Sequence, residues 1–260
     1  METHQTIQDH ALEHMPDDEA TELEDTIWWH VGRQALLRPL LDRAARASGG
    51  QLGPILEAGC GGGGNLALLA RYGDVVGCDP SPTLARRSRE RGVAREVHAC
   101  GLEDLPAEPG SFGLAASFDV MEHVADDAGF ARRLATFVRP GGFYLASVPA
   151  CPWLYSEHDR LLHHYRRYTR RSLARVLEEA GFRVEHSTYF VSTLFPVVAA
   201  ARWKDRLLAR FGKTRATVNV GNVPGPANAA LTALLRVEAL AASRIPLPMG
   251  VWAVALGRKR

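Results

Sequence analysis

The sequence has few cysteines and lacks any long uncharged apolar run. Its 260 residues include four cysteines and no Cys-x-x-Cys pair, which argues against a disulfide framework and against a cysteine zinc site. No stretch reaches the ~18 apolar residues that a membrane-spanning helix needs. The first ten residues, METHQTIQDH, are polar and unlike a secretory signal. We therefore expect reduced cysteines, no integral membrane segment and a cytoplasmic location.

The chain also lacks a large net charge of either sign. The formal net charge is +2, which is too small to indicate a nucleic-acid-binding protein, although arginine is concentrated in residues 166–171. The chain is 46% hydrophobic and 23% charged, as is typical of a globular protein with a sizeable core. Its length exceeds the ~150-residue prior for one domain but still fits one large α/β domain. We expect a single catalytic domain.

Short apolar runs alternate with helical patterns along most of the chain. A polar leader at 1–24 predicts a mobile segment, and the pattern at 26–47 predicts two short helices separated at Pro39. From Gly53 onward the alternation predicts a doubly wound parallel sheet with crossover helices. The predicted strands are PILEAG (54–59), DVVGCD (74–79), REVHAC (95–100), FGLAASF (112–118), FYLASVP (143–149), FRVEHSTYF (182–190) and GVWAVAL (250–256).

This alternation stops between the last two strands. We divide the chain into a leader and helical cap (1–50), a core (51–190), a helical insertion (191–247) and the closing strand of the core (248–260). The insertion has wide apolar faces, which fit a roof over an apolar substrate, the seam of a homodimer or a helix on a membrane surface. We favour the roof or the dimer, and basic residues beside Trp203 keep peripheral membrane contact open.

Four consecutive glycines follow the first predicted core strand. The stretch EAGCGGGG, from Glu57 to Gly64, leads into a helix, and glycine there lets a ligand approach the helix N-terminus. Asp79 ends the second strand, near the ~20-residue offset at which an acidic side chain meets ribose hydroxyls. A nicotinamide dinucleotide and S-adenosylmethionine both carry such a ribose, and the glycine spacing permits either. Glu57 favours S-adenosylmethionine, because a carboxylate repels a pyrophosphate but attracts an ammonium group.

Several motifs together resemble the class I S-adenosylmethionine-dependent methyltransferases. They are ExGCGxG (57–63), GCDPS (77–81), DVMEHV (119–124) and RPGG (139–142), and the resemblance covers roughly residues 27–190 and the last strand. Within that superfamily, EDLP (103–106), MEHV (121–124) and HDRLLHHYRRYT (158–169) resemble the branch of ubiquinone-type O-methyltransferases and many natural-product enzymes. The resemblance implies a Rossmann-like α/β fold with a seven-stranded, mostly parallel sheet whose last strand is antiparallel. It also implies S-adenosylmethionine as the cofactor.

The same resemblance implies which residues contact the cofactor. The first loop would meet the methionine part, Asp79 the ribose, and Pro80 with residues 101–103 the adenine. The family usually has Asp where Gly101 stands, so Glu103 is our substitute for the adenine N6 contact; Gly113 also replaces a usual Asp. The implied cofactor-binding set is Trp29, Arg33, Glu57, Gly59, Cys60, Gly61, Asp79, Pro80, Gly101, Leu102, Glu103, Ser117 and Phe118.

Two tryptophans and an arginine lie together on the N-terminal helical pattern. An indole face of Trp29 can shield a sulfonium, and Arg33 can hold the carboxylate of a methionine moiety. Packing of the helical cap accounts for the tryptophans equally well.

A histidine follows the fourth core strand, at the edge where open sheets bind ligands. We select His123 as the catalytic base, because an unperturbed imidazole titrates near ~6.5; a purely capping histidine is an equally good interpretation. Asp119, Glu122 and His123 also have i, i+3, i+4 spacing, which can gather a divalent ion. They fit a solvated polar rim as well, and we assign no metal.

The segment after the fifth core strand is dense in histidine, tyrosine and arginine. This composition suits a lid over an anionic or phenolic acceptor, and hydrogen bonds that merely tie the segment to the core are the alternative. The candidate acceptor-binding residues, with Trp28 added from the N-terminal helix, are Trp28, Tyr155, His158, His164, Arg167 and Tyr168.

These observations predict methyl transfer from S-adenosylmethionine to a small molecule, most readily to an oxygen atom. The alternatives are a protein that binds S-adenosylmethionine without methylating, such as an intramolecular cyclase or a regulatory sensor, and in third place an oxidoreductase. The acceptor itself is not encoded in any recognisable motif.

Overall fold

A seven-stranded sheet forms the centre of the part of the chain that the structure, a computed structural model, describes: residues 16–210 and 223–260. Its strand order is β3-β2-β1-β4-β5-β7-β6, and only β7 runs antiparallel to its neighbours. The predicted mostly parallel sheet with an antiparallel last strand is confirmed. The strands are β1 (Ile55–Ala58), β2 (Val75–Cys78), β3 (Glu96–His98), β4 (Phe112–Phe118), β5 (Val138–Pro149), β6 (Phe182–Phe190) and β7 (Trp252–Lys259).

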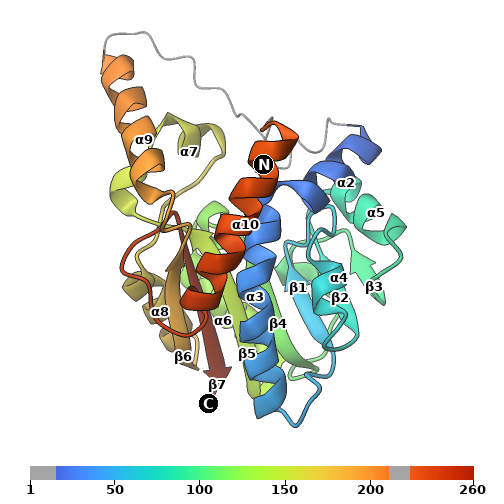
Figure 1. Cartoon of the computed structure of the whole chain (residues 1–260). Helices are drawn as coiled ribbons and strands as arrows, with labels where there is room; N and C mark the ends of the chain where they lie inside the picture. The colour runs from blue at the N-terminus through green and yellow to red at the C-terminus, as the bar shows by residue number, and fades with distance from the viewer. Residues whose placement is uncertain (1–15, 211–222) are drawn as a thin grey trace.

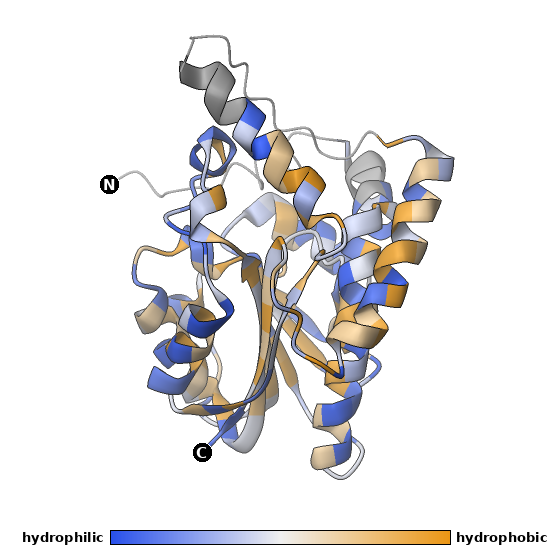
Figure 2. Cartoon of the chain, turned by 60° about the vertical axis from the view of Figure 1, so that its left-hand side comes forward, coloured by the Kyte–Doolittle hydropathy of each residue, from blue (hydrophilic) through white to orange (hydrophobic). Residues whose placement is uncertain are grey.

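Helices cover both faces of this sheet (Figures 1 and 2). The central strands β1, β2 and β4 are buried along their whole length, as expected for strands covered on both sides. The helices are α2 (Asp17–Thr26), α3 (Trp28–Ala47), α4 (Leu66–Leu69), α5 (Pro82–Glu90), α6 (Asp127–Phe137), α7 (Glu157–Leu161), α8 (Arg170–Glu179), α9 (Phe195–Arg210) and α10 (Gly225–Ala242). Short 3₁₀ turns are η1 (Leu102–Asp104), η2 (Met121–His123) and η3 (Pro152–Leu154).

The N-terminal helices differ from the sequence-based expectation. The predicted break at Pro39 is wrong, because α3 continues through this proline and buries Leu36, Leu37, Leu40 and Leu41. Apolar packing on both sides of the proline therefore outweighs its missing N–H group. Residues 17–24 of the predicted leader belong to α2, and residues 1–15 lie outside the described part.

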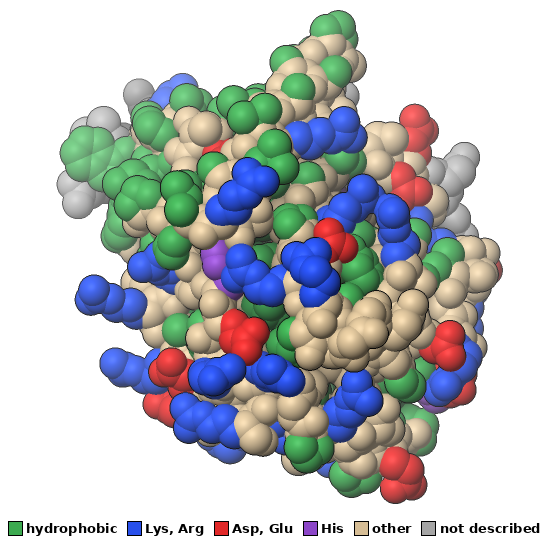
Figure 3. All heavy atoms as spheres, turned by 60° about the horizontal axis from the view of Figure 1, so that its bottom comes forward, with side chains coloured by type: hydrophobic (Ala, Val, Ile, Leu, Met, Phe, Trp, Pro, Cys, Tyr) green, Lys and Arg blue, Asp and Glu red, His purple; other side chains and the backbone are tan. Residues whose placement is uncertain are grey.

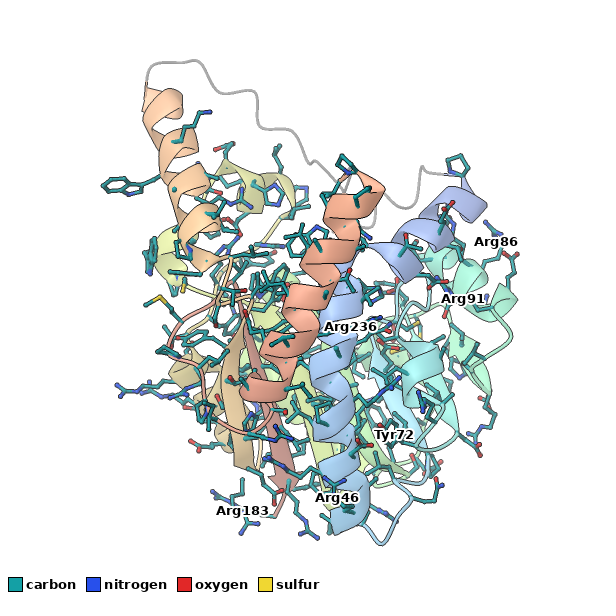
Figure 4. All side chains as sticks on the ribbon, viewed as in Figure 1. Arg46, Tyr72, Arg86, Arg91, Arg183 and Arg236 are labelled. Atoms are coloured by element: carbon teal, nitrogen blue, oxygen red, sulfur yellow. The ribbon has the colours of Figure 1, made fainter. Side chains whose placement is uncertain are left out.

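Ion pairs to Arg91 fasten α2 to the core. Arg91, which lies below α2 in Figure 4, pairs with Glu24 at 2.7 Å and with Asp25 at 2.9 Å. Its Nε also donates to the backbone oxygen of Gly62 at 2.6 Å. The glycine loop and α2 thus share one arginine.

The insertion joins the helical layer instead of forming a separate unit. α10 lies alongside α3 (Figure 1), and Asn228 at its start accepts a hydrogen bond from the Trp28 N–H at 2.9 Å. Glu238 accepts hydrogen bonds from the N–H groups of Ser192 and Thr193, both at 2.8 Å. α9 projects beyond the carboxyl edge of the sheet, and residues 219–222 of the Gly/Pro/Asn-rich stretch at 219–228 lie outside the described residues.

The surface carries apolar side chains on both helices of the insertion. Figure 3 views the molecule with the lower end of Figure 1 turned forward, and it shows Lys and Arg scattered among apolar and acidic side chains. Among the described helices, none is long and apolar enough to cross a membrane. The exposed large apolar residues of α9 and α10 are Val197, Trp203, Leu234, Val237 and Leu240, and Trp153 of η3, Ile245 and Met249 are also exposed.

Candidate cofactor and acceptor site

The glycine loop lies where the strand order reverses, between β1 and its neighbours β2 and β4. Open sheets bind ligands at this point, beyond the carboxyl ends of the strands. Gly59, Gly61 and Gly63 have φ angles of +72°, +53° and +88°, a region that favours glycine. A Cβ atom on Gly59 would collide with the side chain of Val120, so glycine also lets the segment after β4 approach the loop.

Asp79 joins the glycine loop after β1 to the loop that follows β2. One carboxylate oxygen accepts the Gly61 N–H and the other accepts the Ser81 N–H, both at 2.9 Å. The side chain is buried, with 4% of its surface exposed. The acidic residue predicted to meet ribose therefore also fixes the backbone that surrounds it.

Glu57 is a buried carboxyl group with unused hydrogen-bonding capacity. Its Oε1 accepts from Asn65 Nδ2 at 3.1 Å, while Oε2 has no partner within the described residues. Burial raises the pKa of Glu57 to about 8, against a smaller opposing effect of the Asn65 hydrogen bond. Asn65 in turn contacts His30 Nε2 at 3.0 Å. The carboxyl group is thus available to a cationic group of a ligand.

An aromatic and ionic cluster lies around Asp119, directly after β4. Arg33 pairs with Asp119 and lies 5.4 Å from the ring centre of Trp29 and 5.7 Å from that of Phe118. Trp252 stacks on Trp29 with ring centres 5.9 Å apart and donates from Nε1 to Asp119 at 2.9 Å. Trp252 comes from β7, and no local motif singled it out.

A cavity of about 440 Å³ lies next to the loop, between the ends of β1, β2 and β4. Gly59, Pro80, Gly101, Leu102 and Glu103 line it, which groups five of the residues predicted to bind the cofactor. No atom lies within 4 Å of a Cβ built on Gly101, so the missing family Asp leaves open space there. Sequence reasoning missed the rest of the lining: Ala58, Cys78, Cys100, Val120, Val124, Asp126, Gly129, Phe130 and Arg133.

Two residues that were predicted to contact the cofactor have side chains that contact other parts of the protein. Ser117 Oγ lies 2.7 Å from Tyr144 Oη in the buried core, because alternate residues of a strand face opposite sides. Cys60 Sγ lies 3.7 Å from Ser88 Oγ, and burial raises the pKa of the Cys60 thiol. Only the backbones of these two residues can serve a cofactor.

The pKa of His123 lies below the near-neutral value of an unperturbed imidazole. Burial, followed by the nearby His164, lowers the pKa of His123 to about 3. The two rings lie 4.6 Å apart between centres, edge to face. Asp119, predicted as a neighbour by spacing, points instead to Arg33 and Trp252.

The segment between β5 and α8 is tied to the core by most of its polar side chains. Arg167 Nε donates to Asp159 at 2.6 Å, and Tyr168 Oη donates to Asp127 at 2.7 Å. Tyr155 Oη donates to the backbone oxygen of His164 at 2.8 Å. In the same segment, burial and the charge of Arg202 lower the pKa of His158 to about 4.

Comparison with known proteins supports a single family. The model of a methyltransferase domain matches residues 28–187. The chain belongs to this methyltransferase family. Its fold and motifs are those of the class I enzymes, whose cofactor is S-adenosylmethionine.

Two curated relatives carry the same description. The ubiquinone biosynthesis O-methyltransferase of Methylobacterium sp. (strain 4-46) is 30% identical over 196 residues, which cover 62% of this chain and 79% of the relative. The enzyme of that description from Methylocella silvestris is 37% identical over 131 residues, covering 45% of this chain and about half, 51%, of the relative.

Solved structures share the fold at low identity. A putative methyltransferase in complex with the Haloferax volcanii Trm112 activator gives a TM-score of 0.58 at 15% identity and covers 99% of both chains. Haemonchus contortus phosphoethanolamine N-methyltransferase 2, solved with S-adenosyl-L-methionine, gives 0.51 at 18% identity over 79% of this chain and 48% of that one.

The residues of this methyltransferase fit an S-adenosylmethionine ligand. The unpartnered Glu57 oxygen suits an ammonium group, and the glycine-lined cavity has room for a planar base. Arg33 already pairs with Asp119. It would therefore have to bind both Asp119 and the methionine carboxylate to make its predicted contact.

Proposed function

We propose that this protein transfers a methyl group from S-adenosylmethionine to an oxygen atom of a small acceptor and releases S-adenosylhomocysteine. The observation that carries the proposal is the buried Glu57 carboxyl group, with one oxygen unpartnered among the described residues, in β1 directly before the glycine loop. An ammonium group stabilises the ionised form of this carboxyl group, whereas the pyrophosphate of a dinucleotide would gain no opposite charge from it.

Each part of the site has one task. Glu57 holds the ammonium group, Asp79 accepts from the ribose hydroxyls, and the Leu102 N–H with Pro80 faces the adenine. Trp29, Arg33 and Phe118 exclude water around the reacting sulfur, because their packed rings and guanidinium fill the space beside β4. When bound, the cofactor supplies an electrophilic methyl group, so the protein has mainly to align the acceptor.

Acceptors that ionise easily fit this site better than aliphatic alcohols. His123 is the proposed base, and with a pKa of about 3 it is neutral at pH 7 but only weakly basic. A phenol or a carboxylic acid needs less help from a base than an alcohol does. The O-methyltransferase relatives support oxygen as the methylated atom, and His158 is our candidate for contacting the acceptor.

Incubation with radiolabelled S-adenosylmethionine and three acceptor sets, phenols, carboxylic acids and aliphatic alcohols, tests the proposal. We expect S-adenosylhomocysteine to form only with an acceptor, and fastest with the first two sets. Release of methylthioadenosine without an acceptor would indicate a cyclase instead. A rise in melting temperature with NAD and none with S-adenosylmethionine would overturn the assignment of the cofactor.

A further inference from the structure

Four residues form a buried chain of contacts that starts at Glu57 and ends on α2. Asn65, directly before α4, has its Nδ2 3.1 Å from Glu57 Oε1 and its Oδ1 3.0 Å from His30 Nε2. The other ring nitrogen of His30, Nδ1, contacts the backbone oxygen of Glu24. Glu57, Asn65 and His30 are 1%, 7% and 4% exposed, so these contacts are shielded from bulk water.

His30 faces an oxygen atom on each side of its ring. The Glu24 backbone oxygen can only accept a hydrogen bond, so His30 Nδ1 must carry a hydrogen. A neutral imidazole then has a lone pair at Nε2, and this lone pair faces Asn65 Oδ1, which is also an acceptor. A second hydrogen, on Nε2, would satisfy that contact but would place a charged ring in the interior. Burial, followed by the charge of Arg33, lowers the pKa of His30 to about 4, so the ring is neutral at pH 7.

Turning the Asn65 amide by half a revolution removes this conflict. The oxygen and the nitrogen of an amide have nearly the same shape, so the hydrogen-bond network decides which of them lies on which side. In the turned position Nδ2 donates to His30 Nε2, and Oδ1 faces Glu57. Because Oδ1 is an acceptor, the contact with Glu57 is a hydrogen bond only when Glu57 carries a proton. The tautomer of His30 therefore favours the neutral form of Glu57, two contacts away, and a Glu57 pKa of about 8 agrees with this.

The charged groups around this chain of contacts have other partners. Arg33 pairs with Asp119, and the Glu24 carboxylate pairs with Arg91 at 2.7 Å. Asp79 accepts hydrogen bonds from two backbone N–H groups. These groups act on Glu57 and His30 through space, whereas the Asn65 amide is the hydrogen-bond partner of both side chains in the described part of the chain.

We propose that His30 is a positioning residue for the cofactor: acting through Asn65, it stabilises the neutral form of Glu57 until an ammonium group binds there. The inference rests on the proposed function, in which Glu57 holds the ammonium group of S-adenosylmethionine. When that group binds, the Glu57 proton leaves to solvent and the Asn65 amide turns Nδ2 toward the carboxylate. Oδ1 then faces His30, which loses its hydrogen at Nδ1 and gains one at Nε2 by exchange with solvent. The ring stays neutral, one proton is released in all, and the hydrogen bond to Glu24 opens.

The pH dependence of cofactor binding tests this role. Glutamine can present either a donor or an acceptor to Asn65, so His30→Gln lets the amide turn toward Glu57 without a change of tautomer. We expect the pH at which affinity for S-adenosylmethionine levels off to fall by about one unit, and the affinity at pH 6 to rise about tenfold above that of the wild type. Calorimetry from pH 5.5 to 8 measures both. A histidine that only packs α3 against its neighbours would weaken binding equally at every pH.

His186→Gln is the matched control. His186 is also buried and contacts a backbone oxygen, that of Ala242, at 2.8 Å, but it lies on β6 at the edge of the sheet. We expect the pH profile of this variant to level off where that of the wild type does. An unchanged profile in His30→Gln, or the same shift in both variants, would overturn the proposal.

If His30→Gln fails to fold, nitrogen-15 NMR of the wild-type histidines at pH 7 decides the matter. The His30 signals are assigned through the ring of Trp29, 5.7 Å away between centres. We expect the hydrogen on Nδ1 in the cofactor-free protein and on Nε2 in the complex. A hydrogen on Nε2 before the cofactor binds, a doubly protonated ring, or the same tautomer in both states contradicts the proposal. Failure of the wild type to bind S-adenosylmethionine contradicts the proposed function instead, and the tautomer of the cofactor-free protein still tests the chain of contacts.

Discussion

At the scale of single residues, Glu57 sets a condition on cofactor binding. Its pKa of about 8 means that most of the cofactor-free protein carries a neutral carboxyl group at pH 7. An ammonium group beside it favours the carboxylate. Binding of the cofactor should therefore expel a proton from Glu57.

Calorimetry in buffers of different ionisation enthalpy measures this proton. We expect release of nearly one proton per S-adenosylmethionine at pH 7, and affinity that rises about tenfold per pH unit between pH 6 and 7, where the ligand amine stays charged. Glu57→Gln should bind more weakly and release none. Equal proton release by the variant would show that another group titrates.

Asp79 holds the backbone of the surrounding loops and is also the proposed acceptor for the ribose hydroxyls. Asp79→Asn retains one acceptor oxygen but removes the charge, so we expect the dissociation constant for S-adenosylmethionine to rise about 10- to 100-fold. Glu96→Gln, on the exposed end of β3, is the matched control and should leave binding unchanged. An unaltered dissociation constant in Asp79→Asn would exclude the ribose contact.

At the scale of secondary-structure elements, the contact between α3 and α10 depends on one glycine. A Cβ atom on Gly32 would lie 2.6 Å from Leu235 Cδ1 and 2.7 Å from its Cβ. Both residues are buried, and Leu235 is fully so. The helices therefore approach more closely than any larger residue would permit.

Gly32→Ala should lower the free energy of unfolding by about 1–3 kcal/mol, less the roughly 1 kcal/mol that alanine gains in helix propensity. Urea unfolding gives the value. Gly225→Ala, at the other end of this contact with nothing near its Cβ, should be neutral or slightly stabilising. If the two variants were equally stable, the close approach would not matter.

Local pattern was enough to predict most elements of the core. The strand before the glycine loop, the helix capped by Ser81 and the strand at 182–190 all depend on neighbouring residues, and each was found close to its place. Pro39 misled the prediction because its local effect is opposed by packing against distant leucines. α2 was not predicted, and its ion pairs with Arg91 are contacts that periodicity does not register.

For the candidate site, sequence reasoning identified only residues that belong to motifs. Glu57, Asp79 and Leu102 lie at fixed offsets from strand ends, but Trp252 reaches Asp119 across 133 positions. His164 likewise meets His123 only because the segment after β5 folds back on η2. Side-chain direction was also invisible, as Ser117 shows by pointing to Tyr144.

At the scale of the whole molecule, the last strand and the insertion complete the site. β7 enters the sheet between β5 and β6, which carries Trp252 to the carboxyl edge. α10 fastens the N-terminal helix through Asn228, so Trp29 and Arg33 are positioned by residues from the far end of the chain. The site therefore exists only when the entire sheet has formed, and its buried titratable groups affect global stability.

Two of these groups act on stability in opposite directions. The pKa of Glu57 is raised from 4.5 to about 8 on folding, so its contribution is fully present below pH 4.5 and is lost as the pH rises through about 8. Burial and the charge of Arg33 lower the pKa of His30 from 6.5 to about 4, so its contribution is present above pH 6.5 and is lost as the pH falls through about 4. Between pH 4.5 and 6.5 the two slopes cancel.

From pH 6.5 to 8 Glu57 acts without this opposition, and the cofactor-free protein should lose ~2 kcal/mol of stability relative to Glu57→Gln, which cannot titrate. Urea unfolding of both proteins at half-unit pH steps isolates this difference, because every other ionisable group is common to the two chains. Saturating S-adenosylmethionine should abolish the decline, since it keeps Glu57 ionised and paired. Parallel stability curves for the two proteins across this range would mean that Glu57 is already ionised in the folded, cofactor-free state, and the expected proton release on binding would then be absent as well.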